Sequence, residues 1–119
     1  MSRMPMEFFN PEDIPWEPYI IKGEDLNSVL CKVLSKDEET GATTLLIKYP
    51  KGFKMPALSC HTVTEEIFIV KGRITMEGKE YSKGCYAFRP VGMIHGDMDV
   101  LEETILLILY SGPADYIKP

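Results

Sequence analysis

Short apolar stretches recur along this chain, and polar turns that contain glycine separate them. The stretches are four to seven residues long and rich in β-branched side chains, and the turns follow at intervals of roughly six to twelve residues, as in sandwiches and barrels. No window of eleven or more residues keeps its apolar positions at helical spacing. The pattern predicts an all-β fold with strands at Ser28–Leu34, Thr43–Tyr49, Ala57–Thr62, Glu66–Val70, Arg73–Glu77, Lys79–Ser82, Tyr86–Arg89, Ile94–Met98 and Thr104–Tyr110.

Two features of these strands indicate how they pair and pack. The polar segment SKDEETGA between the first two predicted strands is typical of a hairpin loop, so these strands should be antiparallel. The last predicted strand, TILLILY, is apolar on both faces. Such a strand lines a barrel with one face and meets a second sheet or a second subunit with the other.

The first 19 residues differ in composition from the rest. They hold four of the nine prolines, together with Trp16 and three other aromatic residues. Proline at this density is incompatible with a helix interior or a central strand, and the aromatic rings are expected to pack against another surface. We expect residues 1–19 to form an extended arm on the barrel or on a partner subunit, and residues 20–119 to form one β-barrel domain. Trp16 could stack on a ligand, but packing of the arm is the simpler interpretation.

Composition narrows the class of protein. A chain of 119 residues forms one core, and small all-β domains often gain burial by pairing, so we expect a homodimer. The 13 Lys and Arg residues are scattered singly, which argues against nucleic acid as a partner. The N-terminal segment lacks an apolar leader core, and the longest apolar run, Ile105–Tyr110, is too short to cross a bilayer. We therefore expect a cytoplasmic protein without membrane contact.

The three cysteines, Cys31, Cys60 and Cys85, form no CxxC pair and are odd in number. A disulfide framework is therefore not expected. Each lies among apolar or strand-like neighbours, where an unpaired cysteine usually serves as a small core residue.

Candidate chemistry gathers in the segment from Gly52 to His95. The chain has two histidines, His61 and His95, and both lie in this segment beside a carboxylate or a Gly/Pro turn. An isolated histidine is more often structural than a ligand. A β-barrel could nevertheless bring His61, Glu65 and His95 together as metal-binding side chains.

The spacing of this segment resembles the first of the two motifs of the cupin superfamily. That motif consists of glycine, five residues, His-x-His, three or four residues, Glu, six residues and Gly. Here Gly72 closes the motif, six residues separate it from Glu65, and three residues separate Glu65 from His61. The chain departs from the motif at Ser59, which replaces the first histidine, and at Gly52, which lies one residue early.

The second cupin motif is also matched. It consists of glycine, five residues, Pro-x-Gly, two residues, His, three residues and Asn. Gly84, Pro90, Gly92 and His95 are in register with it, and Asp99 replaces the final Asn.

The resemblance implies a double-stranded β-helix, the cupin jelly-roll barrel, with a metal at its wide end. It implies that His61, Glu65 and His95 hold one divalent transition metal ion. Two imidazoles and one carboxylate can bind Fe²⁺ on one face and leave positions open. Zn²⁺, Mn²⁺ or Ni²⁺ would suit the same donors, and a hydrogen-bonded polar patch without metal is the alternative.

Several alternatives concern the ligands. Side chains alternate along a strand, so Ser59 shares a face with His61, and Cys60 could be a ligand only at a bulge. Ser59 suits hydrogen bonding to a bound water or substrate. Of two adjacent glutamates, spacing to the closing glycine selects Glu65, with Glu66 as the fallback. A helix carrying His61 and Glu65 is disfavoured because the segment is rich in β-branched residues.

Within the superfamily, the chain is similar to the small cupins grouped with acetylacetone-cleaving dioxygenases and with the ChrR regulatory type. This rests on its short single-domain form, on His95-Gly96 and on the late Gly112-Pro113 turn. The resemblance implies a metal-dependent, dioxygenase-type oxidoreductase for a small, largely apolar carbonyl or enolisable substrate. The alternatives are a non-redox isomerase, lyase or cyclase, and a non-catalytic ligand-binding or sensory domain. We expect Glu65 and Ser59 to be catalytic, and the substrate pocket to be lined by Ile47, Tyr49, Ser59, Ile67, Phe88 and Met93.

Overall fold

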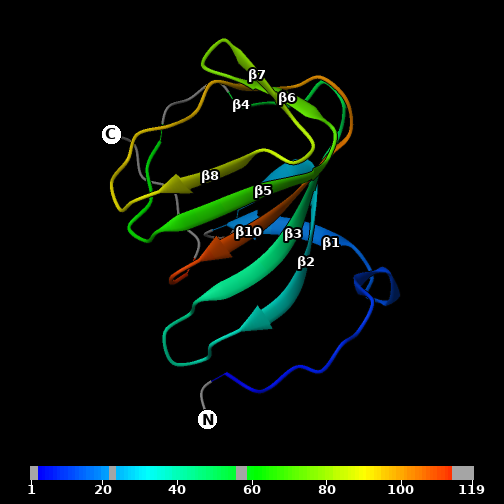
Figure 1. The fold of residues 1–119 in the computed structure, drawn as a ribbon, viewed down its shortest axis with the longest axis vertical. Helices are drawn as coiled ribbons and strands as arrows, with labels where there is room; N and C mark the ends of the chain where they lie inside the picture. Colours follow the sequence, from blue (N-terminus) through cyan, green and yellow to red (C-terminus); the bar gives the residue numbers. More distant parts are fainter. Residues whose placement is uncertain (1–2, 22–23, 56–58, 114–119) are drawn as a thin grey trace.

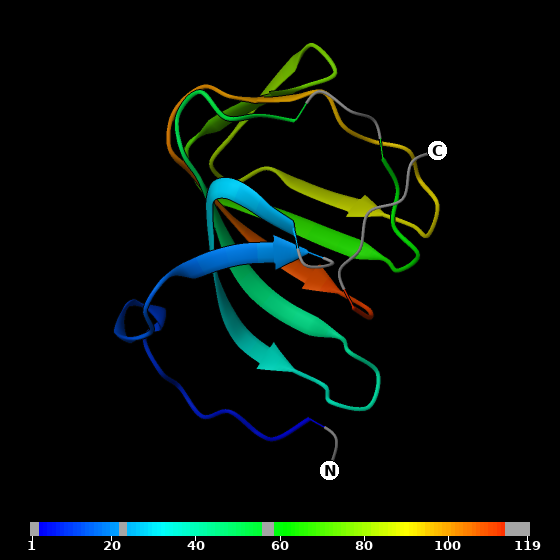
Figure 2. The same cartoon turned by 180° about the vertical axis from the view of Figure 1, so that it is seen from behind.

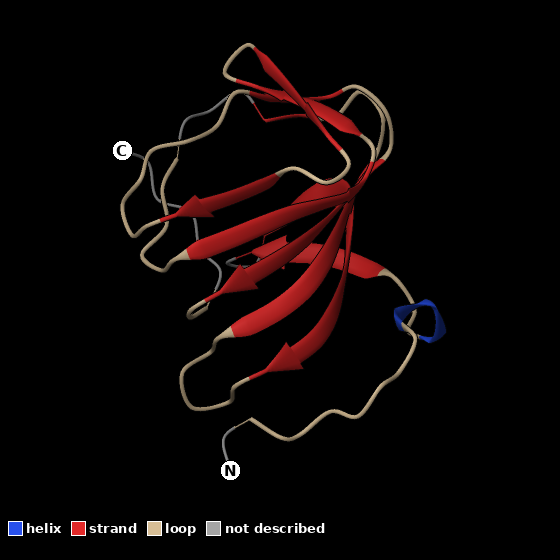
Figure 3. Ribbon diagram, viewed as in Figure 1, coloured by secondary structure: helices blue, strands red, loops and turns tan. Residues whose placement is uncertain are grey.

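The computed structural model describes residues 3–21, 24–55 and 59–113, and it confirms the all-β class. The described elements are a 3-10 helix η1 (Pro11–Asp13) and the strands β1 (Glu17–Ile21), β2 (Glu24–Lys36), β3 (Thr43–Tyr49), β4 (Lys54–Met55), β5 (Glu65–Lys71), β6 (Arg73–Met76), β7 (Lys79–Ser82), β8 (Tyr86–Arg89), β9 (Met98–Val100) and β10 (Thr104–Tyr110). Figure 3 shows η1 as the single helical turn beside the strands of the described chain. No helix among the described residues has the length and hydropathy needed to span a membrane.

Two antiparallel sheets form the barrel. The larger sheet has the strand order β1-β2-β3-β10-β5-β8, and the smaller has the order β4-β9-β6-β7. Figure 1 shows the smaller sheet arching above the larger one, with β8 and β7 at the free edges. The core lies between the sheets, where Ile47 of β3, Val29 of β2 and Ile108 of β10 are almost fully buried.

Most predicted strands are confirmed, and burial alternates along β3, β8 and β10. The bounds of β3, β7, β8 and β10 are the predicted ones, whereas β2, β5 and β6 differ from the predicted strands by one to four residues at their ends. The predicted hairpin between β2 and β3 forms, with the Asp37 side chain accepting hydrogen bonds from the backbone of Glu39 and Thr40.

Two predicted strands are corrected. Residues 57–58 of the predicted strand Ala57–Thr62 lie outside the described residues, and the rest contributes an isolated bridge between Ser59 and His95 instead of a strand. The predicted strand Ile94–Met98 is likewise a loop, and β9 begins only at Met98. Asp97 has a φ of 54°. This left-handed conformation is incompatible with an extended strand.

The later part of the N-terminal arm, from Pro11 onward, contacts the chain's own barrel. Its last predicted residues, 17–19, belong to β1, which pairs with β2 at the edge of the larger sheet. Two lysine ammonium groups make cation–π contacts with the indole of Trp16. Nζ of Lys32 lies 4.5 Å and Nζ of Lys48 lies 4.6 Å from the ring centroid. Lys32 also donates a hydrogen bond to the carbonyl of Pro11, at 2.8 Å. Figure 2 shows the arm, in dark blue, running past η1 into β1.

Candidate metal centre

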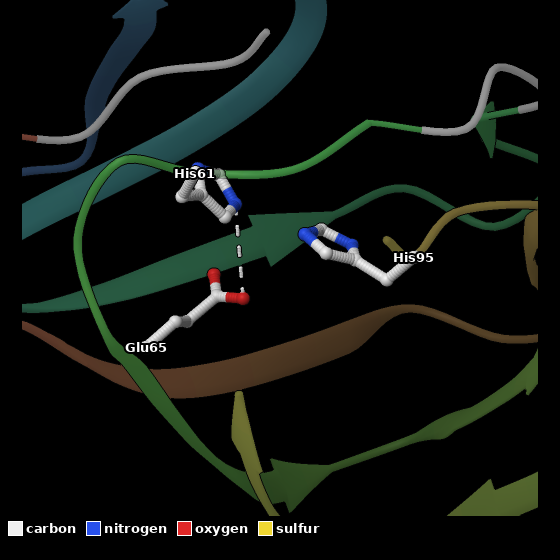
Figure 4. Close-up of side chains that lie close together, drawn as sticks. All are labelled: His61, Glu65 and His95. Carbon is white, nitrogen blue, oxygen red and sulfur yellow. Dashed lines mark ion pairs between the residues drawn. The ribbon is translucent and has the colours of Figure 1, made fainter. Parts of the chain in front are cut away.

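Three buried side chains from different segments converge inside the barrel (Figure 4). Glu65 opens β5, His61 lies in the loop before it, and His95 lies in the loop between β8 and β9. One potential ligand atom from each residue lies within 4.8 Å of the others. The imidazole rings are stacked with centroids 5.0 Å apart, and Nε2 of His61 is 3.8 Å from Oε1 of Glu65.

Backbone hydrogen bonds hold the two histidine loops together. Ser59 and His95 each donate a backbone N–H to the other's carbonyl, at 2.7 and 2.8 Å, and the N–H of Gly92 donates to the carbonyl of His61 at 3.0 Å. Residues that exchange both bonds lie directly opposite, with their side chains on the same face. Ser59 is therefore the immediate neighbour of His95, and its buried Oγ has no hydrogen-bond partner among the described residues.

His95 is prepared to act as a ligand. Its Nε2 is buried and has no hydrogen-bond partner among the described residues. Burial lowers the pKa of His95 to about 4, with further lowering by the nearby Arg89; Glu65 opposes this shift, and His61 adds the smallest effect in the lowering direction. The imidazole is therefore neutral at neutral pH and keeps a lone pair for a metal ion.

Glu65 is oriented by a buried cation. Nη1 of Arg89 donates a hydrogen bond to Oε1 of Glu65 at 2.8 Å, and the two side chains are 12% and 4% exposed. The pair arises from strand register, because Glu65 of β5 faces Arg89 of β8. Glu66 points to the opposite face and accepts a 2.6 Å hydrogen bond from the Tyr86 hydroxyl. The structure thus turns Glu65, and not Glu66, toward the histidines.

The three residues fit a small transition metal ion. Ligand bonds of Zn²⁺ to imidazole and carboxylate are about 2.0–2.2 Å long, so donors that share one ion lie up to about 4.4 Å apart. The candidate ligand atoms lie within 4.8 Å of one another, so a small inward shift of the side chains would bring them within reach of one ion. The donors border a cavity of ≈ 30 Å³, about the volume of one water molecule. Cys60 is buried next to His61 but is not part of this donor group, and residues 61–64 form no helix.

A second, larger cavity of ≈ 280 Å³ adjoins the donor group, between β8 and the β6–β7 hairpin. The two cavities share the lining residues Ile67, Met76, Arg89, His95 and Leu106. Side chains of the larger cavity are mostly apolar. A compound bound there would lie beside His95 and the carboxylate pair.

The predicted pocket residues are found in different places. Tyr49 and Ile67 line the small cavity, and Ile67, Phe88 and Met93 line the larger one. Ile47 is fully buried and lines neither cavity, because it is enclosed within the hydrophobic core cluster. Phe88 is 52% exposed and therefore at the edge, because alternation along β8 turns Ala87 and Arg89 inward. Ser59 is buried beside His95 but lines neither cavity.

Sequence analysis missed two side chains at the centre. In the sequence, Arg89 is a basic residue at the end of a predicted strand, just before Pro90. Only the pairing of β5 with β8 shows that it lies opposite Glu65 and contacts its carboxylate. Tyr110 ends the apolar strand β10 and lies edge-on to His61, with ring centroids 5.6 Å apart. Alternate burial along β10 places Tyr110 on the same face as Ile108, a signal that the uniformly apolar sequence of the strand obscured.

Comparison with known proteins agrees with this architecture. A proposed dioxygenase from Nostoc punctiforme superposes with a TM-score of 0.82 at 24% identity, and the match covers 95% of this chain but only 41% of that one. An acetylacetone dioxygenase from Acinetobacter johnsonii superposes with a TM-score of 0.71 at 20% identity, covering 92% of this chain and 76% of that one. The polyketide cyclase RemF from Streptomyces resistomycificus gives a TM-score of 0.72 at 17% identity, with coverages of 96% and 85%.

At these identities the structural matches establish the fold. No curated protein sequence matches the chain. The sequence model of the ChrR cupin-like domain matches residues 5–115, which is nearly the whole chain and includes both motifs and the three candidate ligands. The protein therefore belongs to the ChrR cupin-like domain family of the cupins, as the resemblance of the two motifs implied.

Proposed function

We propose that the protein is a metal-dependent oxidoreductase of the dioxygenase type that acts on a small, largely apolar carbonyl or enolisable compound. The observation that carries the proposal is the buried donor group of His61, Glu65 and His95 at the boundary of the apolar cavity of ≈ 280 Å³. Fe²⁺ held by two imidazoles and one carboxylate supplies oxygen chemistry, with open positions for substrate and O₂.

The residues of the chain have separate roles in this proposal. His61 and His95 bind through neutral imidazoles, and Glu65 contributes the negative charge. Apolar side chains such as Ile67 and Leu106 line both cavities and exclude water from the donor group. Ser59, beside His95, is proposed to hydrogen-bond a bound water or substrate, which would satisfy its buried hydroxyl.

The test begins with elemental analysis of the protein as purified, in parallel with His61→Ala and His95→Ala. We expect close to one transition metal ion per chain in the parent and a loss of most of it in both variants. Lys83→Ala, in an exposed turn, is the control for handling and should retain the metal. Only trace metal in the parent, or unchanged metal in the histidine variants, would refute the donor group.

The second measurement concerns the reaction. Protein reconstituted with Fe²⁺ is mixed with a panel of β-dicarbonyl compounds, and oxygen consumption is followed with an electrode. Uptake that depends on compound and iron supports the dioxygenase, and its absence with bound iron refutes it.

A non-redox cyclase, isomerase or lyase is the second candidate function. The same donors suit Zn²⁺ or Mn²⁺ as a Lewis acid, and the similarity in fold to a polyketide cyclase is as close as that to an acetylacetone dioxygenase. Substrate conversion without oxygen uptake would favour it. Tight binding without conversion would favour a ligand-binding or sensory domain.

A further inference from the structure

We propose that Arg89 is a substrate-binding residue, and that the ligand of the larger cavity is a small apolar compound that carries one anionic oxygen group, a carboxylate or an enolate. This inference rests on the proposed function, because it names the substrate class of the same site. It follows from the position of one buried cation, from its unused hydrogen-bond donors and from the charge balance around the donor group.

Arg89 supplies the one buried charge in the wall of the larger cavity. Among its lining residues, Arg89 and Glu77 are the only members of the Asp, Glu, Lys and Arg classes. The Arg89 side chain is 12% exposed and lies where the two cavities meet. Glu77 is exposed at the β6–β7 turn, so water screens its charge. The cavity therefore has a guanidinium, which can donate hydrogen bonds, at its inner end and mostly apolar side chains along its walls.

The guanidinium keeps capacity for a ligand. Nη1 donates to Oε1 of Glu65, and Nη2 contacts Sδ of Met76 at 3.3 Å. A guanidinium has five N–H donors, and a thioether is a weak acceptor. An anionic oxygen in the cavity could therefore replace the Met76 sulfur as the acceptor and form a charge-assisted hydrogen bond.

The charge balance favours an anion. In the buried region, the carboxylate of Glu65 and the guanidinium of Arg89 neutralise each other, and both histidines would be neutral as ligands. A divalent ion bound by this group would add two positive charges that no other buried side chain among the lining residues compensates. Uncompensated buried charge is costly. An anionic ligand beside Arg89 would reduce this excess, whereas a neutral ligand would not.

The volume limits the size of the ligand. At about 30 Å³ per non-hydrogen atom, the volume share of a liquid water molecule, ≈ 280 Å³ accommodates roughly nine such atoms. Hexanoate and its neutral isostere hexanamide have this size, and they differ in charge and in little else. They are suitable probes for the charge preference of the cavity.

The experiment compares the affinities of these two probes for protein saturated with Zn²⁺, which excludes redox chemistry, by isothermal titration calorimetry. One additional hydrogen bond to a charged group raises the affinity of a ligand by about tenfold to a hundredfold. We expect hexanoate to bind at least about tenfold more tightly than hexanamide in the parent. Arg89→Gln should abolish this preference and leave hexanamide affinity within about twofold, and Arg89→Lys should retain part of it.

Two controls locate the effect. Arg73→Gln removes a cation of β6 that lines neither cavity, so it should keep the preference of the parent. Cys85 is a half-buried free thiol that lines the larger cavity. Hexanoate should therefore slow alkylation of Cys85 in the parent, measured by mass spectrometry, and should not slow it in Arg89→Gln.

The outcomes separate this inference from the proposed function. Equal affinity of the parent for both probes, failure of hexanoate to bind, or a full preference for hexanoate in Arg89→Gln with normal Zn²⁺ content overturns the role of Arg89 while the metal centre stands. If the parent binds no metal, the proposed function fails, and loss of the preference in Arg89→Gln still supports the anion site. If Arg89→Gln does not fold, Arg89→Lys decides: an undiminished preference would contradict binding through the forked guanidinium.

Discussion

Gly72, the glycine that closes the first cupin motif, is expected to be irreplaceable for a steric reason that the structure makes specific. It forms the tight turn between β5 and β6 with a φ of 102°. A Cβ atom at this position would lie within 2.7 Å of three atoms, which are Oγ1 and Cα of Thr104 and the carbonyl oxygen of Glu103. The Thr104 hydroxyl cannot easily move, because it is fully buried and donates toward the carbonyls of Glu102 and Arg73.

Two costs add for Gly72→Ala. The left-handed backbone costs a residue with a Cβ about 1–2 kcal/mol, and overpacking in a filled space costs about 1–3 kcal/mol more. The free energy of unfolding should therefore fall by about 2–5 kcal/mol. Gly84, which opens the second motif, has a φ of 93°, but no atom lies within 4 Å of the place that a Cβ would take there. Gly84→Ala should therefore show the backbone cost alone, about 1–2 kcal/mol.

The assay is urea unfolding followed by far-UV circular dichroism, with the free energy extrapolated to water for the parent and both variants. A second substitution, Thr104→Ala, in the Gly72→Ala background should recover only part of the loss, because the carbonyl of Glu103 and Cα of Thr104 remain. Equal losses for Gly72→Ala and Gly84→Ala would refute the steric account. Complete recovery by Thr104→Ala would refute the role of the backbone contacts.

Two further predictions concern the missing histidine and the oligomeric state. Ser59→His should place a third imidazole beside His95 and lower the Kd for Zn²⁺ by about tenfold or more, since even residues that only hydrogen-bond the metal ligands change affinity 10–100-fold. The matched control Thr62→His, at an exposed position, should leave the Kd unchanged. An equal gain in both variants would contradict the placement of Ser59. The chain should form a homodimer through the exposed face of β5 and β8, where Phe68 and Tyr86 pair across the strands at 42% and 60% exposure. Light scattering after size-exclusion chromatography should show monomers for Phe68→Glu and dimers for Phe8→Glu. Dimers for Phe68→Glu and monomers for Phe8→Glu would instead place the dimer interface at the N-terminal arm.

Much of the fold could be predicted from local pattern, because a strand is specified by residues that are adjacent in the chain. Short runs of apolar and β-branched residues mark β3 and β10, and glycine turns mark where β7 and β8 begin. The pattern failed around the metal centre. There Ser59–Thr64 and Ile94–Asp97 contain apolar and β-branched residues but form loops, because their backbone is held by the bridge to the other loop and by the left-handed turn at Asp97.

By itself the sequence determined the all-β class, the two motifs and the three candidate ligands, because each depends on spacing along the chain. Only the tertiary structure decided the partners of those ligands. Arg89 meets Glu65 from 24 residues away through the register of β5 and β8, and Ser59 faces His95 across a single bridge. Register between distant strands leaves no periodic mark in the sequence, since the close packing of the whole barrel fixes it. The surroundings of the candidate metal centre, including the cation proposed to bind its substrate, therefore emerged from the fold.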